Sequence, residues 1–97
     1  MSAKLSTPAK KPENNELRSV LAWNVRRHRI LNNLSQEQLA FEAELDRTYV
    51  SALERRVWNV ALSNIEKLAT ALKVPAWQLL YVPDELNDES KNETPTK

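Results

Sequence analysis

Apolar residues recur through the middle of the chain at spacings of three and four, which is the period of an α-helix. The clearest stripe comprises Leu62, Ile65, Leu68, Ala69 and Leu72. Strands would show apolar and polar residues in alternation, and the sequence has no useful length of that pattern. Leu, Ala, Glu, Gln, Lys and Arg, all good helix formers, dominate the middle instead. We therefore expect an all-α protein.

The pattern and its breaks divide the chain into five short helices. We expect them at about residues 16–31, 35–43, 46–55, 62–72 and 75–81. The connections between them are short, which favours a compact five-helix bundle. On the first helix, the expected inner stripe is Leu17, Leu21, Val25 and His28. His28 is therefore expected to be a core residue rather than a ligand or a base.

Capping residues support these boundaries. Ser35 with Gln38, and Ser63 with Glu66, have the spacing of a capping box. Asp46 is a good N-cap, and its carboxylate also suits the positive end of a helix dipole. The helices that begin near Ser35 and Asp46 are short and separated by about three residues. A bend this tight predicts a helix-turn-helix from about Ser35 to Arg56.

Charge is distributed unevenly along the 97 residues, although the net charge is only +1. Residues 1–15 hold three lysines and one glutamate, and residues 84–97 hold five acidic residues and two lysines. The segment between them holds nine basic and seven acidic residues. We expect a flexible basic arm at 1–15, one folded domain at 16–83 and a disordered acidic tail at 84–97. The basic clusters of the domain can neutralise phosphates.

Several function classes have no support in the composition. The chain has no cysteine, no glycine and one histidine, which leaves no thiolate metal site, no glycine-rich phosphate loop and no recognised nucleophile. We expect no enzyme activity, no cofactor and no metal. The sequence has no apolar run near 18 residues and no secretory signal, so we expect no membrane partner, and the absence of cysteine fits a cytoplasmic protein.

Residues 34–40 (LSQEQLA) resemble the opening of the helix-turn-helix in Xre/Cro-type transcription regulators. Residues 47–55 (RTYVSALER) resemble their recognition helix, and Asn59 with residues 62–72 completes the pattern. The resemblance covers about residues 21–80 and is closest to controller proteins of restriction–modification systems. It implies a fold of the lambda-repressor-like type and binding to double-stranded DNA.

The resemblance also assigns candidate roles to individual residues. A recognition helix directs its first turn into the major groove, where a guanidinium can bond a guanine edge. The candidates for base reading are Arg47, Thr48, Ser51 and Ala52. The candidates for contacts with the DNA backbone are Gln36, Tyr49, Arg55, Arg56 and Asn59. Ordinary solvated surface is the competing interpretation for Arg55 and Arg56.

Two structural features follow from the resemblance. Glu54 is expected to form an ion pair with Arg29 rather than to act as a catalytic acid. Asn33, Glu44 and Arg56 occupy positions where the family usually has glycine. The turns at Glu44 and Arg56 are therefore expected either to relax into right-handed geometry or to carry strain.

The last helix is rich in apolar residues, which often mark an interface. Its candidates for a dimer contact are Trp77, Leu79, Leu80 and Tyr81. We expect Trp77 to fill the bundle and some of the other three to face a second subunit. The roles of Trp23, Phe41 and Trp58 stay open at this point.

The sequence favours a homodimeric regulator that binds a pseudo-palindromic operator and needs no small-molecule ligand. A restriction–modification controller, a phage-type repressor and an antitoxin are the alternatives within that class. A protein-interaction bundle that does not bind DNA is the alternative from another class.

Overall fold

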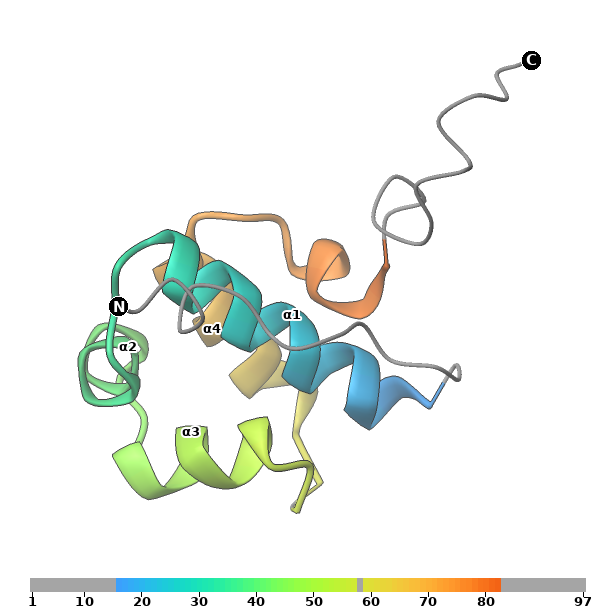
Figure 1. Ribbon diagram of the computed structural model, residues 1–97, viewed down its shortest axis with the longest axis horizontal. Coiled ribbons are helices and arrows are strands. Elements are labelled where there is room, and N and C mark those ends of the chain that lie inside the picture. Colours follow the sequence, from blue (N-terminus) through green and yellow to red (C-terminus); the bar gives the residue numbers. More distant parts are fainter. Residues whose placement is uncertain (1–15, 58, 83–97) are drawn as a thin grey trace, which may run out of the picture.

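A computed structural model describes residues 16–57 and 59–82 of the chain (Figure 1). The predicted basic arm, the acidic tail and Trp58 lie outside the described residues. Within that part of the chain every regular element is helical: α1 (Leu17–Leu31), α2 (Gln36–Ala43), α3 (Arg47–Glu54), α4 (Leu62–Leu72) and the 3₁₀-helix η2 (Ala76–Leu80). The prediction of an all-α fold is confirmed. The expected fifth α-helix is instead five residues of 3₁₀-helix after Pro75, a geometry common in short terminal segments.

The cap predictions have mixed outcomes. The Ser35 capping box is present: the Gln38 backbone N–H donates to Ser35 Oγ at 3.0 Å, and the Ser35 N–H donates to Gln38 Oε1 at 2.7 Å. Asp46 is the N-cap residue of α3, although its side chain makes no capping hydrogen bond. The capping box predicted for Ser63 was wrong. Ala61 is the N-cap of α4, so Ser63 already lies inside the first turn of the helix.

The core lies between the four α-helices and η2. Its largest fully buried apolar side chains are Val25, Leu39, Val50, Leu68, Leu72 and Leu79. The stripe predicted for α1 is correct at Leu21 and Val25 and wrong at its ends. Leu17 is 59% exposed, because it lies at the first position of α1 on the edge of the bundle, and His28 is only half-buried.

One buried polar side chain, Asn24, attaches η2 to α1. Its amide nitrogen donates to the carbonyl oxygens of Leu79 at 3.0 Å and of Tyr81 at 2.9 Å. The side chain is fully buried, so these two acceptors replace the water that the amide loses on folding. Asn24 therefore fixes the position of the last described segment, a role that the sequence pattern did not indicate.

Within residues 16–57 and 59–82, four residues adopt left-handed backbone geometry without being glycine: Asn33, Glu44, Arg56 and Lys73, with φ between 59° and 65°. Of the two outcomes expected for Glu44 and Arg56, the structure has the strained one. Lys73, which was not anticipated, ends α4 in the same way that Glu44 ends α2. Left-handed geometry costs a residue with a Cβ about 1–2 kcal/mol.

In η2, Leu79 and not Trp77 is the residue that fills the bundle, which is the opposite of the prediction. Leu79 is fully buried, whereas Trp77 is 60% exposed and packs edge-on against Tyr81 with ring centroids 5.9 Å apart. A 3₁₀-helix has three residues per turn, so Leu79 shares its inward face with Ala76 rather than with Trp77. Trp77 therefore does not fill the bundle, and Leu79 is not available to a second subunit.

No helix within residues 16–57 and 59–82 has the length and apolar character needed to cross a membrane.

Candidate nucleic-acid interface

The helix pair α2–α3 is joined by a turn whose geometry is set by backbone hydrogen bonds. Glu44 takes the left-handed conformation after α2, and the Leu45 N–H donates to the Ala40 carbonyl at 2.8 Å. Leu45 packs against the core, and Asp46 then begins α3. The turn directs α3 along one edge of the molecule, where Figure 1 shows it below α1 and α2. Helices 36–43 and 47–54 therefore form the predicted helix-turn-helix.

The outer face of α3 carries three of the four residues predicted to read bases. Arg47 and Thr48 are exposed, and Ser51, one turn further on, is half-buried. Ala52 is 1% exposed and lies in the core, so its prediction as a base-reading residue was wrong. At 100° per residue, positions 47, 48 and 51 share one 100° arc of the helix, and position 52 falls only 40° beyond Thr48, so the burial of Ala52 comes from the packing of α3 against its neighbours and not from the helical period.

A buried carboxylate holds α3 in place. Glu54 accepts hydrogen bonds from Arg29 Nε at 2.7 Å and from Arg29 Nη2 at 3.1 Å, and its side chain is 2% exposed. Gln36 Nε2 donates to the same carboxylate at 3.1 Å, and Arg26 lies 3.9 Å from it. The predicted ion pair between Arg29 and Glu54 is thus present. Because its partners come from α1 and α2, this cluster fixes the end of α3 relative to both helices.

Gln36 has a structural role that leaves part of its amide free. The Nε2 group has two hydrogens, and the bond to Glu54 uses one of them. The side chain is half-buried at the first position of α2, where the free N–H groups of a helix end favour an anion. A phosphate contact by Gln36 stays a prediction.

The residues predicted to contact the DNA backbone from α3 onward fall into two groups. Arg55, Arg56 and Asn59 are exposed at the C-terminal end of the helix. Tyr49 is half-buried, and its hydroxyl accepts a hydrogen bond from Asn64 Nδ2 of α4 at 3.0 Å. Asn64 therefore positions the Tyr49 hydroxyl. Asn64 belongs to the segment that resembles the family, but its sequence position alone predicted no role for its side chain.

The outer face of α1 carries a second set of contacts. The Arg27 guanidinium carbon lies 4.9 Å from the centroid of the Trp23 ring, and Arg27 Nη2 is 3.4 Å from His28 Nε2. Burial, and then the nearby Arg27 charge, lower the pKa of His28 below its usual 6.5. Trp23 is half-buried, and the Arg27 guanidinium lies over the face of its ring. Phe41, in contrast, is 82% exposed on α2.

Comparison with known proteins supports this interpretation of the helix pair. Residues 25–76 match the model of a family described as helix-turn-helix. This match spans more than half of the chain and includes α2, α3 and α4. The chain belongs to the helix-turn-helix family.

Its relatives include a hypothetical transcription factor and several controller proteins. The chain is 48% identical to control protein C.BamHI of Bacillus amyloliquefaciens over 68% of its own length and 83% of that protein. It is 57% identical to the solved structure of a hypothetical transcription factor from Neisseria, with a TM-score of 0.78, covering 84% of this chain and 93% of that one. The restriction-modification controller protein C.AhdI of Aeromonas hydrophila shares 47% identity and a TM-score of 0.60, covering 62% of this chain and 91% of that one. The chain is thus a DNA-binding helix-turn-helix regulator related to restriction–modification controller proteins.

Proposed function

We propose that this protein regulates transcription by binding a specific DNA sequence, with α3 as the recognition helix in the major groove. One observation carries the proposal. The Arg47, Thr48 and Ser51 face of α3 is directed away from the core, while the buried Glu54 cluster fixes the helix from behind. A rigid helix with accessible polar side chains in its first turn is what direct base reading requires.

Each residue on that face has a role suited to its chemistry. Arg47 bonds the O6 and N7 atoms of a guanine, and Thr48 and Ser51 offer hydroxyls to neighbouring base edges. Arg55, Arg56 and Asn59 contact phosphates beyond the C-terminal end of α3, and Gln36 contacts a phosphate at the start of α2. The aromatic ring of Tyr49 lies against the sugar wall of the groove. Ala52 has no part in the contact because it is buried.

The protein acts as a homodimer on a pseudo-palindromic operator. Two copies related by a two-fold axis present two recognition helices to half-sites about one helical turn, roughly 34 Å, apart. Trp77 and Tyr81, which are 60% and 47% exposed, and the half-buried Leu80 remain candidates for this contact after Leu79 is excluded.

Among such regulators, we favour a restriction–modification controller over a phage-type repressor or an antitoxin. C.BamHI and C.AhdI, whose names state that they are controllers, share 48% and 47% identity with this chain. We further propose that the protein works at the cytoplasmic nucleoid and has no catalytic activity.

The test is selection of preferred sites from a pool of randomised duplexes, followed by sequencing. We expect one enriched sequence with two-fold symmetry and half-site centres about 10 base pairs apart. Recovery of an unenriched pool at low salt would contradict the proposal and favour a protein-interaction bundle.

A further inference from the structure

Arg26 of α1 carries a positive charge that the Glu54 cluster does not need. Glu54 Oε1 already accepts hydrogen bonds from Arg29 Nη2 and Gln36 Nε2, both at 3.1 Å, and Oε2 accepts one from Arg29 Nε at 2.7 Å. The bidentate pair with Arg29 balances the charge of the carboxylate. Arg26 Nη1 lies 3.9 Å from Oε1, which is beyond hydrogen-bond distance. The cluster therefore has one positive charge in excess, and Arg26 carries it.

The Arg26 guanidinium is accessible, and its hydrogen-bond donors are not in use. The Arg26 side chain is 42% exposed, whereas those of Arg29 and Glu54 are 11% and 2% exposed. Among the residues that the structure describes, the Arg26 side chain donates no hydrogen bond. Attraction to Glu54 restrains the position of the guanidinium without using its N–H groups. A guanidinium in this state can bind an oxyanion through two parallel N–H bonds.

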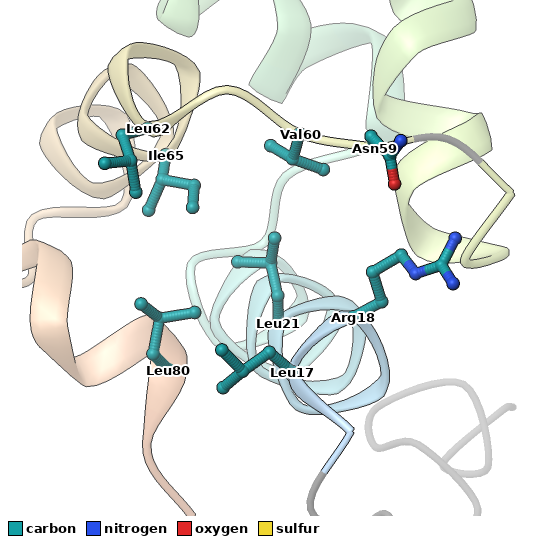
Figure 2. A pocket seen from close by; sticks show the side chains of 8 residues that line it. All are labelled: Leu17, Arg18, Leu21, Asn59, Val60, Leu62, Ile65 and Leu80. Atoms are coloured by element: carbon teal, nitrogen blue, oxygen red, sulfur yellow. The ribbon is translucent and has the colours of Figure 1, made fainter.

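Two other arginines of α1 already have partners. Arg18 lies 3.5 Å from the Glu16 carboxylate, at one end of an apolar cavity of about 340 Å³ (Figure 2). Arg27 stacks over Trp23, with its guanidinium carbon 4.9 Å from the centroid of the ring. Arg26 therefore differs from both, because it combines an unbalanced charge with unused donors.

The location of Arg26 places this charge beside the face of α3 that is proposed to read bases. At 100° per residue, Glu54 falls only about 20° from Arg47 around the helix, and yet it is buried. The side chains that bury Glu54 must therefore lie next to the Arg47 face, at the C-terminal end of α3. One of them is Gln36, a proposed phosphate contact, and Arg26 lies next to the same carboxylate oxygen as Gln36.

We propose that Arg26 binds a phosphate of the DNA backbone and that the Glu54 carboxylate orients it for this contact. The inference rests on the proposed function and adds a phosphate contact from α1. Arg29 neutralises Glu54, so the carboxylate does not repel the phosphate. The same phosphate can accept the second amide hydrogen of Gln36. Because every DNA sequence has the same phosphates, the contact adds affinity and fixes the position of α3 without adding base preference.

The first experiment measures the salt dependence of binding to a mixed-sequence duplex for the wild type, Arg26→Gln and the matched control Arg27→Gln. Both variants remove one positive charge, at neighbouring positions of α1. Arg27, however, lies beside Asn24, which holds η2, and Figure 1 shows η2 and α3 on opposite sides of α1. Circular dichroism verifies the fold of both variants.

We expect the log–log slope of Arg26→Gln to be less steep than that of the wild type by about 0.9 for each bound protomer, and that of Arg27→Gln to be unchanged. A wild-type slope in Arg26→Gln, or an equal decrease in both variants, would overturn the inference. A wild type whose binding does not depend on salt would instead contradict the proposed function, so the two failures are distinguishable.

The second experiment separates a phosphate contact from two other roles of Arg26. In urea unfolding, Arg26→Gln should have nearly the wild-type midpoint, because Glu54 keeps its hydrogen bonds from Arg29 and Gln36. A large decrease in the midpoint would make Arg26 a structural partner of Glu54 and would overturn the inference.

The same variant is then tested in competition between the selected duplex and a scrambled one. We expect both affinities to fall by the same factor, at least about threefold, so that their ratio stays at the wild-type value. A clear decrease in the ratio would make Arg26 a base-reading residue and would overturn its assignment to a phosphate.

Discussion

Glu54 and Arg29 form a bidentate ion pair, with Nε–Oε2 and Nη2–Oε1 distances of 2.7 and 3.1 Å, and the Glu54 side chain is 2% exposed. Arg29 also donates to the Leu34 carbonyl at 2.9 Å, just before α2 begins. The pair therefore joins the end of α1, the start of α2 and the end of α3, the proposed recognition helix. The relative positions of these three helices depend on this one buried carboxylate.

Replacement of Arg29 by methionine should destabilise the fold strongly. It would leave Glu54 buried with a negative charge and without its bidentate partner, which costs roughly 3–5 kcal/mol. Urea unfolding measures the loss. The matched control is Arg18→Met, which breaks an exposed pair with Glu16 and should cost less than about 1 kcal/mol. Similar losses in the two variants would contradict the structural role of Arg29.

Replacement of Arg47 by alanine should remove sequence preference and leave the fold intact. Arg47 is exposed on the first turn of α3, and a bidentate contact with guanine contributes about 1–3 kcal/mol of discrimination. The measurement is competition between the selected duplex and a scrambled one, with circular dichroism to verify the fold. A variant that discriminates as well as the wild type would show that α3 does not read bases through Arg47.

Glycine at the left-handed turns should stabilise the protein. Glu44 and Arg56 have φ values of 61° and 63°, so Glu44→Gly and Arg56→Gly should each raise the free energy of unfolding by about 1 kcal/mol. Asn32, with φ of −93°, is the control: glycine there should bring no gain. The DNA affinity of Arg56→Gly shows whether Arg56 contacts a phosphate or is only an exposed turn residue. A clear loss of affinity supports the phosphate contact, and unchanged affinity would limit Arg56 to an exposed turn residue.

Stability should decrease as the pH falls through the range in which His28 titrates. Burial and the charge of Arg27 lower the pKa of His28 in the folded state below 6.5, so the unfolded chain binds the proton more readily. The contribution of His28 is therefore fully present above pH 6.5 and is lost as the pH falls through its folded pKa. Thermal unfolding of the wild type and His28→Gln at pH 7.5 and pH 5 tests this. The pH dependence should be smaller in the variant, and an identical dependence would contradict the assignment to His28.

Features governed by local sequence were predicted well. Ser35 and Gln38 form their capping box because the two side chains are three residues apart on one turn. The Arg29–Glu54 pair was predicted through the family resemblance, and the structure has it. In both cases the signal lies within a short motif or a recognisable combination of motifs.

Features governed by tertiary packing were not predicted. Asn24 bonds to carbonyl groups 55 and 57 residues away, and no local pattern indicates such partners. Ala52 was misplaced because a small apolar residue suits either side of a helix, and the orientation of α3 is set by its packing. Trp77 was predicted to be buried and Leu79 to be a candidate for the dimer contact, but the structure has Leu79 buried and Trp77 exposed. The segment is a 3₁₀-helix, and its period of three residues changes which residues share a face.

The central claim is DNA binding through α3 and the arginines that follow it. The most direct test is the salt dependence of wild-type binding to a mixed-sequence duplex. If Arg55 and Arg56 of both protomers neutralise phosphates, the log–log slope should be about −3.6, and the affinity should fall about a hundredfold between roughly 50 and 200 mM salt. Affinity that does not change with salt would contradict the account.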